Sequence, residues 1–259
     1  MTLVWLADLR LNVGLFGPEE APPVILIHGL GLDLRLWEGL LPALARNRVL
    51  ALDLRGHGLS DTPPAPYALG GLIRDVERLA DHFNLRDAVV VGQGEGGLIA
   101  QGLAVKRLDM VRGLVLTGTA TRLGNPDLWA ARIARHREHG PDIDMDLVAL
   151  LGPRWKALTT ADPVRAMLED TRPAGWQGVA AAMATADLYQ TTATLTLPTL
   201  VLAGGEDRKV PPDMQRETAD LIAGAEFRLL PGAPHLAMLS DPARFGEALQ
   251  GFLTRIGHG

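Results

Sequence analysis

Short apolar runs alternate with segments of helical periodicity along almost the whole chain. The runs at residues 24–27 and 88–91 are continuously apolar, as in strands that are covered on both faces, whereas residues 242–255 repeat their apolar positions at helical spacing. Strands that alternate with helices predict βαβ units, and therefore an α/β fold with a mostly parallel central sheet flanked by helices. The pattern predicts a hairpin at residues 3–16, strands at 24–27, 48–54, 88–91, 111–116, 199–202 and 226–230, and helices at 34–45, 72–83, 98–108, 212–222 and 242–255.

The pattern changes between residues 121 and 194, where strand character disappears. Helical segments there are interrupted by Gly140-Pro141, by Gly152-Pro153 and by Pro173. Strand character returns at residue 199, so the helical stretch is inserted into the sheet rather than added to its end. We therefore expect a core domain formed by residues 1–120 and 195–259, and a helical cap, or lid, formed by residues 121–194.

Composition favours a small-molecule partner over a macromolecular one. The chain has 259 residues, 47% of them hydrophobic, and a formal net charge of −5, which suits a buried core and offers no basic face for nucleic acid. Without cysteine, disulfides, thiolate metal sites and a cysteine nucleophile are excluded. No apolar run is long enough to span a membrane and no basic segment leads into an apolar one near the start, so cytoplasmic residence is expected. We expect no cofactor and no metal, and association into a homo-oligomer is left open.

Chemically informative residues follow the predicted strands in a fixed order. His28-Gly29-Leu30-Gly31 ends one strand, and a loop from Asp53 to Asp61 with the pattern D-x-R-G-x-G-x-S follows the next. A very short glycine-rich turn, Gly92-Gln93-Gly94-Glu95-Gly96-Gly97, then joins a strand to a helix. Beyond the helical insertion, Asp207 and His235 each follow a strand.

In this order the motifs resemble the α/β-hydrolase fold family, in which nucleophile, acid and histidine follow one another along the chain. More narrowly, the sequence resembles 3-oxoadipate enol-lactonases and related small esterases over nearly its full length. That resemblance is carried by residues 96–104, by Gly175-Trp176 with the alanine-rich residues 180–183, and by residues 197–199 leading to Asp207. It implies that His235 is the catalytic base, that Asp207 orients it, and that the backbone N–H groups of Leu30 and Glu95 form an oxyanion hole.

The sequence departs from this family at the nucleophile. Gly92 and Gly96 set the register of the G-x-S-x-G turn and place Gly94 where the serine belongs. The only serines, Ser60 and Ser240, do not lie on a strand-to-helix turn. We therefore predict a hydrolase of the ester or lactone class, in which the His-Asp dyad activates water directly. Three alternatives stay open: the dyad abstracts a substrate proton as in lyases or cofactor-free oxygenases, the protein binds a small molecule without catalysis, or glycine has replaced the serine of an active hydrolase.

Several other residues have both a functional and a structural interpretation. Glu95 is favoured in the first turn of a helix by the helix dipole alone, but a carboxylate facing the pocket there would repel an oxyanion. Gly92, Gly94 and Gly97 also match a dinucleotide-binding pattern, yet no acidic residue ends the next strand. The remaining candidates are three cap tryptophans that either line a substrate pocket or form the core of the cap: Trp129, Trp155 and Trp176.

Overall fold

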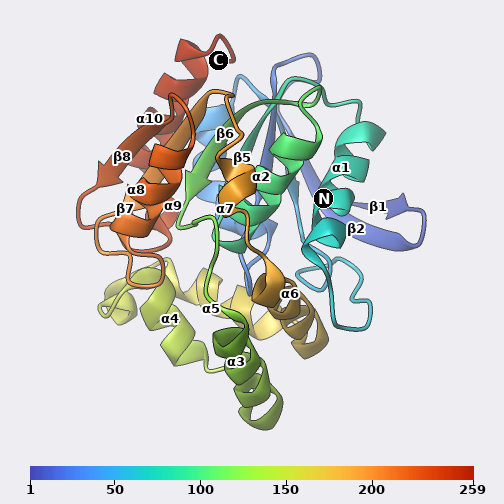
Figure 1. Cartoon of the computed structure of the whole chain (residues 1–259), viewed down its shortest axis with the longest axis vertical. Helices are drawn as coiled ribbons and strands as arrows, with labels where there is room; N and C mark the ends of the chain where they lie inside the picture. Colours follow the sequence, from blue (N-terminus) through green and yellow to red (C-terminus); the bar gives the residue numbers. More distant parts are fainter.

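A computed structural model describes all 259 residues and contains one eight-stranded sheet (Figure 1). The strand order is β1-β2-β4-β3-β5-β6-β7-β8. The hairpin strands β1 and β2 are antiparallel, and β2 also pairs antiparallel with β4, whereas all later pairs are parallel. The predicted α/β fold with a mostly parallel sheet is therefore confirmed. The strands are β1 (Thr2–Leu6), β2 (Leu9–Phe16), β3 (Pro23–Ile27), β4 (Arg48–Leu52), β5 (Ala88–Gln93), β6 (Val111–Thr117), β7 (Thr199–Gly204) and β8 (Glu226–Leu230).

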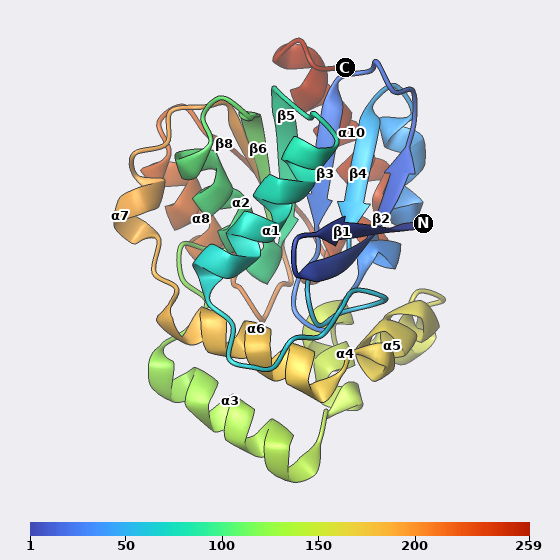
Figure 2. The same cartoon turned by 90° about the vertical axis from the view of Figure 1, so that its right-hand side faces the viewer.

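Helices cover both faces of the sheet, which explains why the central strands are continuously apolar. α1, α2 and α8 pack on one face, and η1, α9 and α10 pack on the other (Figure 2). Each face forms its own hydrophobic core, with 39 buried residues in one cluster and 33 in the other. The flanking helices are η1 (Leu34–Leu44), α1 (Leu69–His82), α2 (Glu95–Lys106), α8 (Pro212–Leu221), α9 (Ala237–Ser240) and α10 (Pro242–Arg255).

The helix predicted at residues 34–45 is present, but its hydrogen-bonding pattern is unusual. η1 is built of 3₁₀ turns, not of α-helical turns. It contains Pro42, which has no backbone N–H to donate to the preceding turn. Its apolar side, including the fully buried Trp37, still packs against the sheet, so the hydrophobic pattern located the element without determining its hydrogen bonding.

The segment between β6 and β7 is helical, and α3, α4, α5 and α6 lie beyond the carboxyl ends of the parallel strands, whereas α7 packs beside α2 (Figure 2). The division of the chain into a core domain and a cap over the site stays a prediction. None of the helices is both long and apolar enough to cross a membrane. The inserted elements are α3 (Pro126–His139), α4 (Ile143–Leu151), η2 (Trp155–Ala157), α5 (Ala161–Asp170), α6 (Pro173–Thr185) and α7 (Tyr189–Thr192).

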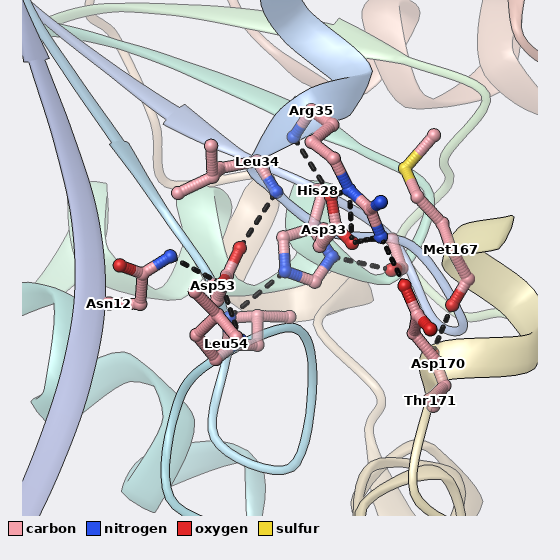
Figure 3. A network of polar contacts seen from close by, with 12 residues as sticks. Asn12, His28, Asp33, Leu34, Arg35, Asp53, Leu54, Met167, Asp170 and Thr171 are labelled. Carbon is pink, nitrogen blue, oxygen red and sulfur yellow. Dashed lines mark hydrogen bonds and ion pairs between the residues drawn. The ribbon is translucent and has the colours of Figure 1, made fainter. Parts of the chain in front are cut away.

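Two buried histidines hold together the loops that follow β3 and β4. The Leu54 N–H donates to Nε2 of His28 over 2.9 Å (Figure 3), and the Gly31 N–H donates to Nε2 of His57 over 3.1 Å. Each ring donates its other N–H to a backbone carbonyl, so both imidazoles are neutral in the folded chain. Burial lowers the pKa of His28 and, with the nearby His28 ring, lowers the pKa of His57 to about 3.

A network of polar contacts extends from the same loops to the cap. Asp53 accepts hydrogen bonds from the Leu34 N–H and from the side chain of Asn12, both at 2.8 Å (Figure 3). Close by, Arg35 bridges Asp33 of the core and Asp170 at the end of α5, at 2.6 and 2.8 Å. The loop after β3 is thus fixed to β2, to the loop after β4 and to the inserted helices.

The neutral state of His57 makes stability depend on pH in a defined direction. An unfolded histidine binds a proton near its usual pKa of about 6.5, whereas folded His57 resists protonation until about 3. Its contribution is therefore fully present above about pH 6.5 and is lost as the pH falls through this window, at up to about 1.4 kcal/mol per pH unit. Urea unfolding should show a smaller loss of stability on acidification for His57→Gln, which keeps an acceptor for the Gly31 N–H but does not titrate.

The matched control for this experiment is His139→Gln, because His139 is exposed at the end of α3. This variant should retain the pH dependence of the native chain. Equal slopes for His57→Gln and the native chain would show that His57 does not contribute to acid sensitivity.

Candidate functional site

The turn between β5 and α2 is a sharp elbow with Gly94 at its tip. Gly94 has φ 54° and ψ −122°, a left-handed conformation that side chains other than hydrogen rarely adopt. Just beyond it, the backbone of Gly96 lies against the end of β3, where a Cβ would come within 2.5 Å of the His28 carbonyl oxygen. The elbow and the loop that starts at His28 are therefore in direct contact.

His235 and Asp207 meet beside this elbow. Nδ1 of His235 donates to Oδ2 of Asp207 over 2.8 Å, and neither side chain is exposed. The backbone N–H groups of Lys209 and Val210 each donate to Oδ1 of Asp207 over 2.9 Å. The side chain of Gln215 donates to Oδ2 over 3.1 Å, so the carboxylate has a fixed orientation. With Asp207 accepting at Nδ1, Nε2 of His235 is left unprotonated in the neutral ring.

The second ring nitrogen of His235, Nε2, faces the elbow. A Cβ built on Gly94 would lie 3.6 Å from Nε2 of His235 and 3.7 Å from Cα of Gly29, an ordinary contact distance. The residues predicted to form the site, Gly94, Asp207 and His235, are thus brought together. Nε2 is hydrogen-bonded to the side-chain amide of Gln93 over 2.8 Å, so this amide takes the place that a serine hydroxyl would take as the partner of the histidine.

The Leu30 N–H, which was predicted to be one donor of an oxyanion hole, already has a hydrogen-bond partner. The Leu30 N–H donates to Oε2 of Glu95 over 2.9 Å, and the Glu95 side chain is completely buried. Oε1 of the same carboxylate lies 3.3 Å from Nζ of Lys209. Burial alone would raise the pKa of Glu95, but Lys209 and the N–H groups of Leu30 and Glu95 outweigh it and lower the pKa to about 2. The donor predicted to bind a substrate oxygen therefore binds an ionised side chain of the same protein.

A cavity of about 380 Å³ lies between the cap and the core, and it ends at the residues that hold Glu95. Leu30 and Lys209 belong to its wall, whereas Gly94 and His235 do not. The buried carboxylate of Glu95 is thus held by two residues of the cavity wall. The cavity is lined by Leu30, Arg132, Arg135, His136, Gly140, Pro141, Asp142, Met145, Asp146, Ala149, Leu150, Leu168, Trp176, Arg208 and Lys209.

The three cap tryptophans have different positions. Trp176 lines the cavity, and its ring stacks on His136 at a centroid distance of 4.3 Å. Trp129 and Trp155 are instead buried in the two hydrophobic cores, and neither belongs to the cavity wall. The burial of these two residues agrees with the core alternative, because the inserted helices need large apolar side chains to pack on one another and on the sheet.

Other potential nucleophiles have structural roles. Oγ of Ser60 donates to the Asp53 carbonyl over 2.7 Å, and Oγ of Ser240 donates to the Ala237 carbonyl over 3.1 Å. Both lie away from the elbow, as the sequence indicated. No group of three or more histidine, aspartate or glutamate side chains is arranged to hold a metal ion.

Two residues that contact the site, Gln93 and Lys209, were not predicted from the sequence. Gln93 precedes Gly94 in the elbow, and its position next to the missing nucleophile was a signal that could have identified it. Lys209 follows Asp207 by two residues and pairs with Glu95, which the sequence alone does not indicate, because the pairing depends on how two distant loops approach each other.

Comparisons with known proteins identify relatives that match the chain over nearly its full length. The chain is 27% identical over 256 residues to 3-oxoadipate enol-lactonase 2 of Acinetobacter baylyi, covering 96% of this chain and 94% of that protein. A hydrolase from Pseudomonas aeruginosa superposes with a TM-score of 0.93 at 34% identity, with 97% of each chain covered. The enol-lactonase from Burkholderia xenovorans also gives a TM-score of 0.93, at 29% identity over 98% of this chain and 100% of that one.

The family model described as "Alpha/beta hydrolase family" matches residues 24–248. This range includes Gly94, Asp207 and His235 as well as the whole inserted segment. The dinucleotide-binding alternative for the glycine turn has no such support. The protein is therefore a member of the α/β-hydrolase family, of the ester- and lactone-hydrolase type.

Proposed function

We propose that this protein hydrolyses a small carboxylic ester or lactone by using His235 and Asp207 to activate water directly. The observation that carries the proposal is the pairing of His235 with Asp207 at 2.8 Å while the opposite nitrogen faces the elbow at Gly94. The relatives described as enol-lactonases and esterases support the substrate class. Glycine at residue 94 leaves space for a water molecule where the family carries its serine hydroxyl.

The reaction then needs one addition and one elimination. Nε2 of His235 takes a proton from water while the water oxygen bonds to the carbonyl carbon. The tetrahedral intermediate breaks its bond to the leaving oxygen, which receives the proton back from His235, and a carboxylic acid is released. Asp207 stabilises the imidazolium that forms between these steps. The amide of Gln93 has to release Nε2 before the water can use it, because both compete for the same lone pair.

This route is expected to be slow. Serine hydrolases without their nucleophile retain roughly 10³- to 10⁴-fold acceleration over water, which comes from positioning and charge stabilisation. Charge stabilisation is reduced further, because the Leu30 N–H already donates to Glu95. Non-hydrolytic base catalysis by the same dyad remains the alternative enzyme class, but no contact of the site favours it over water activation.

A second candidate function is non-catalytic binding of a small molecule in the cavity under the cap. The observation that favours it is the isolation of the dyad, because His235 is 1% exposed and Glu95 is not exposed at all. Quenching of Trp176 fluorescence by ligands, without turnover in any variant, would support binding. Turnover that depends on His235 would rule out a purely binding role.

The role of His235 can be tested by replacing it. His235→Ala in the native chain should reduce hydrolysis of small esters and enol-lactones by about 10²- to 10⁴-fold, because the general base is lost. His139→Ala is the matched control and should leave the rate unchanged, since His139 is exposed at the end of α3. Steady-state rates across a panel of phenyl esters and lactones provide the measurement. A rate insensitive to His235 would contradict the proposed function.

Restoring a nucleophile tests the position of Gly94. Gly94→Ser should become covalently labelled at residue 94 by an alkyl fluorophosphonate, whereas the native chain should not, and mass spectrometry of the peptide reports the adduct. The same variant should lose about 1–3 kcal/mol of unfolding free energy, because a side chain at φ 54° is strained. Labelling at another residue, or no labelling of a folded variant in which Glu95 is also replaced by alanine, would show that residue 94 does not face the dyad.

A further inference from the structure

Glu95 occupies the position at which the carbonyl oxygen of a substrate would bind. Its Oε2 accepts the Leu30 N–H over 2.9 Å, which is the geometry that an oxyanion would require. Gly29, in the same loop, makes room for this arrangement, because a Cβ there would lie 3.0 Å from Oε2 of Glu95 and would also overlap the side chain of Gln93. The loop is therefore shaped around the two side chains that flank Gly94.

The carboxylate is held firmly in this position. Lys209 approaches its second oxygen at 3.3 Å, and that oxygen has no other hydrogen-bond partner. Because Glu95 is also the first residue of α2, the partial positive charge of the helix N-terminus lies beside its negative charge. A buried carboxylate with these partners stays ionised, so it places a full negative charge where the transition state of ester hydrolysis develops one.

We propose that Glu95 is an internal occupant of a carboxylate-binding seat, formed by the Leu30 N–H and Lys209, and that it blocks this seat against substrate carbonyl groups. The inference rests on the proposed function only for the location of the site. The bound side chain has the same chemical group as the acid released by ester hydrolysis, so Glu95 imitates a bound product. A substrate carbonyl can be polarised by Leu30 only after Glu95 has moved away.

Lys209 links this block to the cavity. Its side chain is 19% exposed and belongs to the cavity wall, to which Leu30, the other partner of Glu95, also belongs. An anionic group that enters the cavity would compete with Glu95 for Lys209. The seat therefore accepts one carboxylate at a time, either that of Glu95 or that of a ligand.

The test uses phosphonylation, since the attacked phosphorus needs the same hydrogen-bond donor as a carbonyl. In a Gly94→Ser background the serine oxygen bonds to phosphorus, fluoride leaves, and His235 takes the proton. Adding Glu95→Ala should accelerate labelling by about 10²-fold or more, because one oxyanion donor is worth roughly 10²- to 10³-fold. Acetate should slow labelling of the double variant by taking the vacated seat, but should not affect Gly94→Ser alone.

Glu206→Ala in the same background is the matched control, because Glu206 is an exposed carboxylate beside Asp207 and makes no hydrogen bond with its side chain. It should leave the labelling rate unchanged. If Glu95→Ala does not fold by circular dichroism, Glu95→Thr supplies the test with a shorter side chain that carries no carboxylate, and it too should accelerate labelling. Equal rates with and without the Glu95 carboxylate, or no competition by acetate, would overturn the inference. Because every arm carries a serine, the outcome does not depend on whether the native chain hydrolyses esters.

Discussion

The close approach of the elbow backbone to the end of β3 is the constraint on which the rest of the site depends. Gly96 fits against the His28 carbonyl only because it has no side chain. This contact brings the first residue of α2 under the loop that carries Leu30, and it turns the tip of the elbow toward His235. The site is consequently set by backbone packing, and the identity of residue 94 changes its chemistry without changing its shape.

Much of the fold and part of the site could be predicted because their signals are local or follow chain order. The buried strands show as apolar runs, and Asp207 and His235 each follow a strand, so the order of motifs predicts that they meet. The position of the Glu95 carboxylate is different, because it depends on Leu30 and Lys209 arriving from separate loops. Trp129 and Trp155 pose the same problem, since large aromatic side chains suit a pocket and a core equally well until the helices are placed.

Gly94 also has an energetic meaning. The family places a serine at a strained elbow, and a strained non-glycine residue costs about 1–3 kcal/mol. Glycine removes that cost, and it removes the nucleophile as well. Glycine at residue 94 therefore lowers the strain of the elbow backbone and abolishes nucleophilic attack from this position. This agrees with the general trade-off between stability and a strained active site.

Glycine at residue 94 and glutamate at residue 95 are physically consistent with each other. A charged carboxylate in the oxyanion position would oppose acyl transfer by an active serine, because it repels the charge that develops on the carbonyl oxygen. Once the serine is absent, that repulsion no longer limits an acyl-enzyme step, and the same carboxylate can satisfy the Leu30 N–H and Lys209. The catalytic and the binding hypotheses therefore differ in one physical quantity, the free energy required to move Glu95 out of its seat. If this free energy is small, the protein is a slow hydrolase that uses its dyad. If it is large, the protein is a receptor in which His235 and Asp207 are present but do not catalyse hydrolysis.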